Sequence, residues 1–102
     1  MERIIAPDKW VLVHIEEDLW KVFGTWTSDG RWKINSGIES VELQEDGYVV
    51  NGFSGSRYLC REGRYGFAHS YGEGILTNMC DNHKSACIIG EKEAKKKFNG
   101  EK

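Results

Sequence analysis

The chain has 102 residues, of which 39% are hydrophobic and 12% aromatic, and this size fits a single domain over 1–102. Aromatic residues at that frequency exclude a disordered chain, and a single proline excludes a proline-rich linker. The net charge of −2 excludes the strongly basic class of nucleic-acid-binding proteins.

Short apolar runs separated by turn residues fill the first two thirds of the chain. Asp-Gly pairs at Asp29-Gly30 and Asp46-Gly47 predict two-residue hairpin turns, because glycine adopts a positive φ at low cost. Ser54-Gly55 and Glu62-Gly63 bracket a further run. Strands are therefore predicted at 10–15, 19–26, 32–34, 41–43, 48–50 and 57–60. We expect a mainly β (α+β) fold, an antiparallel meander of six or seven strands that is curled or barrel-like.

The last third of the chain predicts one or two short helices. In residues 74–80, Ile75, Leu76, Met79 and Cys80 have the spacing of one helical stripe. Residues 91–98 contain helix formers, but Ala94 and Phe98 are the apolar side chains there. We therefore expect 91–102 to be an exposed or frayed tail.

The longest apolar stretch, 10–15, is interrupted by His14 and is far shorter than the ~20 residues of a membrane-spanning helix. Residues 1–8 show no basic region followed by an apolar one, so no signal peptide is expected. Three cysteines without a close-spaced framework are typical of reduced thiols. A cytoplasmic protein with no membrane association is predicted.

Charge is distributed unevenly along the chain. Residues 1–56 contain ten acidic and five basic residues, a net charge of −5, whereas the remainder is net positive. Glu39 and six further carboxylates lie in or next to the predicted loops. The six predicted partner-binding residues are Glu16, Glu17, Asp18, Glu42, Glu45 and Asp46. They would present a negative field to a protein partner with a basic surface. A dispersed, solubilising surface is the alternative interpretation.

A second hypothesis comes from arginines interleaved with aromatic residues. The predicted ligand-binding set is Arg57, Arg61, Arg64, Tyr65 and Tyr71. Rings that stack on bases, next to arginines that contact phosphates, are typical of nucleotide or single-stranded nucleic-acid binding. The structural alternative is that the rings belong to the core and the arginines to the outer face.

Two further patterns in the sequence bear on metal binding and catalysis. Cys80, His83 and Cys87 have zinc-ligand spacing, with Cys60 or His69 as a fourth ligand, although Cys80 also fits a buried helical stripe. Residues 52–56 approach a nucleophile elbow but place Ser56 where glycine is needed. We expect no enzyme, no catalytic residue and no cofactor.

Turn glycines and aromatic residues recur with a characteristic spacing over about 20–79, at Asn35-Ser36-Gly37-Ile38, Val41, Asp46-Gly47, Gly52-Phe53-Ser54-Gly55-Ser56, Tyr58, Cys60, Tyr65-Gly66 and Tyr71. With this spacing the chain resembles a group of small uncharacterised proteins of bacteria and their phages. The resemblance implies a phage or prophage origin and transfers no catalytic residue. Small phage proteins of this kind commonly bind and block a host protein, including components of anti-phage defence.

Overall fold

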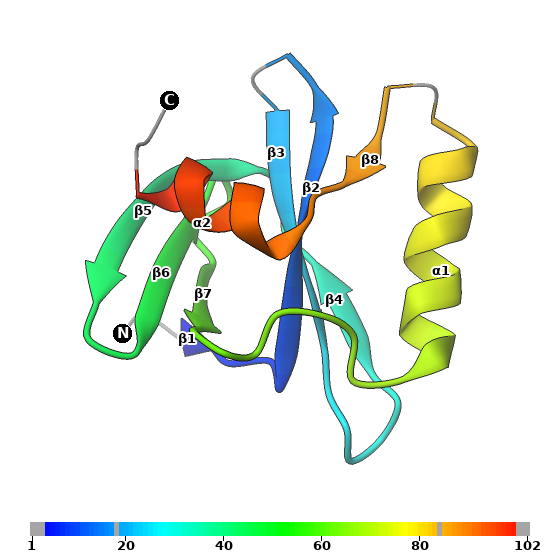
Figure 1. Ribbon diagram of the computed structural model, residues 1–102, viewed down its shortest axis with the longest axis horizontal. Helices are drawn as coiled ribbons and strands as arrows, with labels where there is room; N and C mark the ends of the chain where they lie inside the picture. Colours follow the sequence, from blue (N-terminus) through cyan, green and yellow to red (C-terminus); the bar gives the residue numbers. More distant parts are fainter. Residues whose placement is uncertain (1–3, 18, 84, 100–102) are drawn as a thin grey trace.

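The computed structural model describes residues 4–17, 19–83 and 85–99, which form eight strands and two helices (Figure 1). In chain order these are β1 (Ile4–Ile5), β2 (Lys9–Glu16), β3 (Leu19–Thr25), β4 (Trp32–Ile34), β5 (Ile38–Gln44), β6 (Gly47–Gly52), β7 (Arg57–Arg61), α1 (Ser70–Asp81), β8 (Cys87–Ile88) and α2 (Glu91–Phe98). The mainly β prediction with two short helices is confirmed.

The strands form two four-stranded sheets that are not closed into a barrel. The first sheet has the order β1-β7-β6-β5 and the second the order β4-β3-β2-β8. Each contains an antiparallel run of consecutive strands, β5-β6-β7 and β2-β3-β4, as a meander predicts. The end strands do not follow the meander, since β1 pairs with β7 in parallel and β8 pairs with β2.

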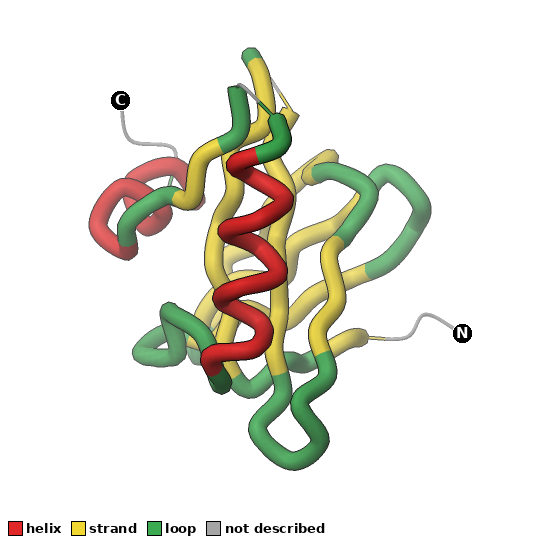
Figure 2. The backbone as a smooth tube through the Cα atoms, turned by 90° about the vertical axis from the view of Figure 1, so that its right-hand side faces the viewer, coloured by secondary structure: helices red, strands yellow, loops and turns green. Residues whose placement is uncertain are grey.

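The second sheet is the middle layer of the molecule. One face, with Val11, Val13 and Phe23, packs against Leu76 of α1. The other face, with Leu12 and Val22, packs against core residues of the first sheet and of α2. Figure 2 shows α1 lying along the strands that it covers. Because both faces are covered, β2 and β3 contain consecutive buried residues and do not alternate strictly between apolar and polar.

The chain crosses from the second sheet to the first at Asn35, whose side chain is 4% exposed. The Asn35 Oδ1 accepts a hydrogen bond of 2.9 Å from the Val22 backbone amide, and the backbone N–H of Asn35 donates to the Val22 carbonyl. The β6–β7 turn packs on this corner, where the Phe53 amide donates to the Gly37 carbonyl and the Ser54 amide to Ser36 Oγ. The corner is thus built from residues 35–37 together with the turn residues 53–54, and its role is structural.

Asn35→Ala is expected to lower the free energy of unfolding by about 2 kcal/mol, because the buried Val22 amide loses its acceptor. The matched control is Asn78→Ala, at an exposed position of α1, where alanine favours the helix. Urea denaturation of both variants measures the difference. Equal stability of the two variants would contradict the assigned role of Asn35.

The two predicted turn pairs of the first sheet have different outcomes. Ser54-Gly55 lies in the turn between β6 and β7, as predicted. Asp46-Gly47 is not the two-residue loop of its hairpin: Gln44 pairs with Gly47, so Glu45 and Asp46 form the loop and Gly47 begins β6. Neither loop residue has a positive φ, whereas Gly47 has a φ of 154°.

Helix α1 begins four residues before the predicted segment. His69 caps it, because its Nδ1 accepts from the Gly72 amide at 2.9 Å and its Nε2 lies 3.1 Å from the Arg31 carbonyl. Leu76 is buried, Ile75 and Cys80 are partly buried against the same core cluster, and Met79 is 36% exposed, so the predicted stripe faces the second sheet. Neither helix in the described part of the chain is long and apolar enough to cross a membrane.

The prediction of an exposed tail over 91–102 is wrong for α2, and 100–102 lie outside the described residues. Ala94 and Phe98 are buried in the core between the sheets. Phe98 stacks on Trp10 with ring centroids 5.5 Å apart and meets Tyr48 edge-on at 5.0 Å. Two apolar residues four positions apart are enough to dock α2 on the core, because large rings from both sheets pack against the helix there.

Candidate functional site

The predicted acidic residues occupy two separate places. Glu45 and Asp46 form the exposed loop of the β5–β6 hairpin, at the lower left of Figure 1. Glu16 and Glu17 lie at the β2–β3 turn, at the top of the same view, and Asp18 lies outside the described residues. The fold therefore does not gather the five described members of the set at one end, and two candidate surfaces replace one.

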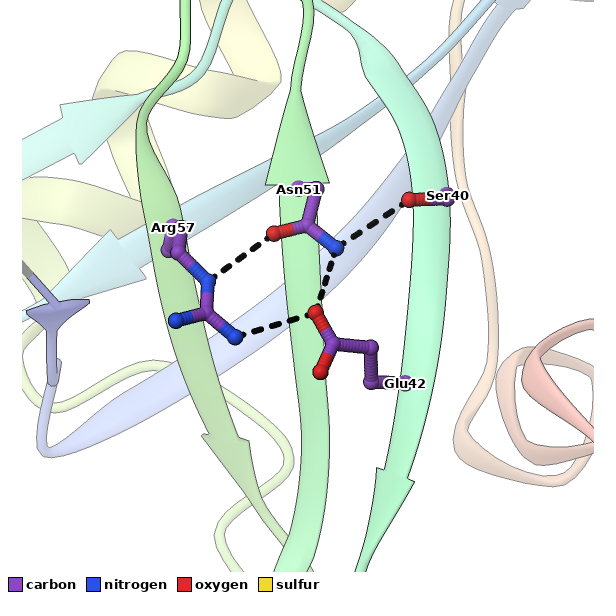
Figure 3. Close-up of polar contacts among 4 residues, drawn as sticks. All are labelled: Ser40, Glu42, Asn51 and Arg57. Carbon is purple, nitrogen blue, oxygen red and sulfur yellow. Dashed lines mark hydrogen bonds and ion pairs between the residues drawn. The ribbon is translucent and has the colours of Figure 1, made fainter. Parts of the chain in front are cut away.

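Glu42 is already partnered within the chain. It lies on the outer face of the first sheet, where its Oε2 accepts from Asn51 Nδ2 and from Arg57 Nη2, each at 2.9 Å (Figure 3). Asn51 also bonds Ser40 Oγ and Arg57 Nε. The hydrogen bond from Asn51 and the charge of Arg57 lower the pKa of Glu42. This network links β5, β6 and β7, so the primary role of Glu42 is to stabilise the sheet.

The other carboxylates of the hairpin lack such a partner. Glu39, Glu45 and Asp46 are exposed, and none of them forms an ion pair with another described residue. We name Glu39, Glu45 and Asp46 the hairpin carboxylates. Their charge stays available to an external cation, in contrast to that of Glu42.

The same hairpin provides a free sheet edge. β5 is the outermost strand of the first sheet, and within the described part of the chain its backbone hydrogen-bonds to β6 only. An edge strand directs alternate N–H and C=O groups away from its neighbour. Beside this edge lies a pocket of about 220 Å³, lined by Trp20 of β3, residues 38–41 of β5, and Lys97 and Phe98 of α2.

The arginine and aromatic set is dispersed over the fold. Arg57 is tied to Glu42, and the Tyr65 ring packs on Trp10 with centroids 4.7 Å apart. The Tyr65 hydroxyl bonds the Leu12 amide and the Ile89 carbonyl, and burial raises the pKa of Tyr65 to about 12. Tyr71 is 64% exposed on α1, a helix that packs on the other sheet from Arg57. The predicted stacking surface is therefore not assembled.

The remaining members of that set, Arg61 and Arg64, support the core through their backbones. The Arg61 carbonyl accepts from Trp10 Nε1 at 2.8 Å, and the Arg64 carbonyl accepts from the Trp10 amide. Both side chains are exposed next to β7. Arg61 and Arg64 therefore form a small basic surface, but the Tyr65 ring is packed against Trp10 and cannot stack on a base beside them.

The predicted zinc ligands are not gathered either. No three His, Cys, Asp or Glu side chains within residues 4–17, 19–83 and 85–99 lie close enough together to hold a metal ion. Cys80 and His83 instead line a pocket of about 350 Å³ between α1 and the second sheet, with aliphatic residues such as Val13 and Ile34. Desolvation raises the pKa of Cys80, so its thiol stays protonated, in keeping with the apolar interpretation.

Cysteine, histidine and serine side chains that could act as a nucleophile or a base have other roles in the described part of the chain. Burial raises the pKa of the Cys60 thiol, which keeps it in the weakly nucleophilic form. His69 uses both ring nitrogens at the start of α1, and His14 stacks on Trp20 while its Nε2 contacts the Glu17 carbonyl. Ser54 and Ser56 bond to one another in an exposed turn.

Sequence reasoning missed three contributors to this site. Ser40 and Asn51 hold Glu42 in place, and Leu43 is 62% exposed next to the hairpin loop. Ser40 lies outside the strand predicted at 41–43, and the partner of Glu42 on β6 depends on a pairing register that no local signal specifies. Comparisons with protein-family models, curated proteins and solved structures find no match for this chain.

Proposed function

We propose that this chain is a small non-enzymatic binding protein that uses the β5–β6 hairpin to bind a partner with a basic surface. The observation that favours it is the exposure of the hairpin carboxylates, which have no cation partner among the described residues. Carboxylates without an internal ion pair, on an exposed edge strand and its loop, attract a basic surface and speed its association. The dispersal of the arginine and aromatic set weighs against a nucleic-acid partner.

Two charge-reversal variants test this proposal against labelled oligolysine. The hairpin variant is Glu39→Lys, Glu45→Lys, Asp46→Lys, and the turn variant is Glu16→Lys, Glu17→Lys, Asp18→Lys. Both variants change the net charge by the same amount, so a difference in their affinity for oligolysine shows which surface binds it. At low salt the hairpin variant is expected to bind about tenfold or more weakly than the wild type, and the turn variant to lose much less. Fluorescence anisotropy across a salt series measures both.

The opposite order of the two variants, or the absence of any oligolysine binding, would refute the proposal. Labelled oligothymidine is the comparison ligand. If it binds and Arg61→Glu with Arg64→Glu abolishes that binding, the nucleic-acid alternative replaces our proposal.

The resemblance to small phage and bacterial proteins extends the proposal to a host target. In that case the chain binds and blocks a host protein, such as an anti-phage defence component, in the cytoplasm. The free thiols Cys60, Cys80 and Cys87 are consistent with a reducing compartment. Capture from a bacterial lysate, compared between the hairpin and turn variants, would identify that target.

A further inference from the structure

We propose that β5 accepts an extended segment of the partner as an additional strand, in which basic and apolar side chains alternate. This inference rests on the proposed function, because it specifies how the basic partner meets the hairpin. The free edge of β5 supplies the backbone hydrogen-bonding groups, and strand addition to such an edge is a recurrent mode of peptide recognition.

The alternation follows from the two faces of β5. Val41 and Leu43 pair with Val50 and Tyr48, which are core residues, so they lie on the inner face of the sheet. Glu42 pairs with Val49 and lies on the outer face with Ser40. Side chains of an added strand share these faces with the residues opposite them. Apolar side chains are therefore expected opposite Val41 and Leu43.

The pocket beside β5 gives the apolar side chains a place to bind. Trp20, Ile38 and Phe98 line it, and Lys97 lies over the Trp20 ring with its Nζ 4.6 Å from the ring centroid. A volume of about 220 Å³ suits one aliphatic side chain of a partner better than a drug-sized ligand. Leu43, which is largely exposed, would be covered by the same added strand.

Charge selects a basic segment and disfavours a second copy of this chain. β5 and its loop, residues 38–46, contain four acidic residues and no basic one, so two β5 edges paired antiparallel would bring like charges close together, which is destabilising. A basic segment reverses the sign of that interaction. Its cations would lie near the loop residues Glu45 and Asp46, because Glu42 is already paired with Arg57.

Three labelled peptides of identical charge test this inference. The first alternates lysine and valine, the second carries N-methyl groups on its lysine amides, and the third carries them on its valine amides. An added strand turns alternate amides toward β5, so one methylated peptide loses the ladder hydrogen bonds and the other keeps them. We expect one to bind about tenfold or more weakly than the parent peptide and the other to bind within about twofold.

Equal binding of the three peptides would show recognition by charge alone. It would overturn strand addition and leave the proposed function standing. Loss with both methylated peptides, or failure of the parent peptide where oligolysine binds, would also overturn it. Failure of oligolysine itself refutes the proposed function, so the two failures are distinguishable.

Discussion

Gly47→Val is expected to lower the free energy of unfolding by about 3 to 5 kcal/mol, and so to lower Tm by more than about 10 °C. A Cβ at this position would lie 2.3 Å from the Cys60 carbonyl oxygen and 2.8 Å from Arg61 Cα. Both atoms belong to the backbone of β7, which pairs with β6, so they cannot move without disrupting the hydrogen bonds between these two strands. The φ of 154° adds strain for a β-branched residue.

Gly63→Val is the matched control for Gly47→Val. Gly63 has a φ of 81°, but a Cβ there would meet no atom within 4 Å. This variant therefore reports the backbone strain without the steric clash, and its destabilisation is expected to be about 1 to 2 kcal/mol. Thermal unfolding followed by circular dichroism compares the two. A Gly47 variant no less stable than the Gly63 variant would contradict the close approach of β6 and β7.

Phe98→Ala is expected to lower the free energy of unfolding by about 3 to 5 kcal/mol, the range for deleting a buried phenylalanine. Phe98 is 6% exposed, and its ring lies between Trp10 of the second sheet and Tyr48 of the first. Its loss opens a cavity between the two sheets at the point where α2 closes them. Truncation after Glu91 removes Ala94 as well, so we expect a larger effect from it.

Lys96→Ala provides the control on the same helix, because Lys96 is exposed and takes no part in the core. Its stability is expected to stay within about 0.5 kcal/mol of the wild type. Urea denaturation followed by tryptophan fluorescence measures both variants, since Trp10 is the ring on which Phe98 stacks. If Phe98→Ala matches Lys96→Ala, α2 is not part of the core.

Much of the fold class was determined by local sequence. Alternating apolar residues and turn residues placed six strands near their observed positions, because strand formation and tight turns depend on side chains a few residues apart. The exposure of Glu45 and Asp46 also followed locally, from their position in a hairpin loop.

The division into two sheets was decided by tertiary structure. The crossover needs Asn35 to replace a backbone partner of Val22, thirteen residues away in the chain, and no periodicity reveals such a bond. Burial of Phe98 likewise depends on Trp10 and Tyr48, which meet it only after both sheets have formed.

The candidate site shows the same division between local and long-range determinants. Sequence alone identified Glu42 and Arg57 as members of two rival charged sets. The pairing register of β5, β6 and β7 joins them in one ion pair of 2.9 Å, and it leaves the hairpin carboxylates without an ion pair to another described residue. Cross-strand register depends on contacts between distant segments, so which charges are neutralised and which stay available is a property of the folded chain.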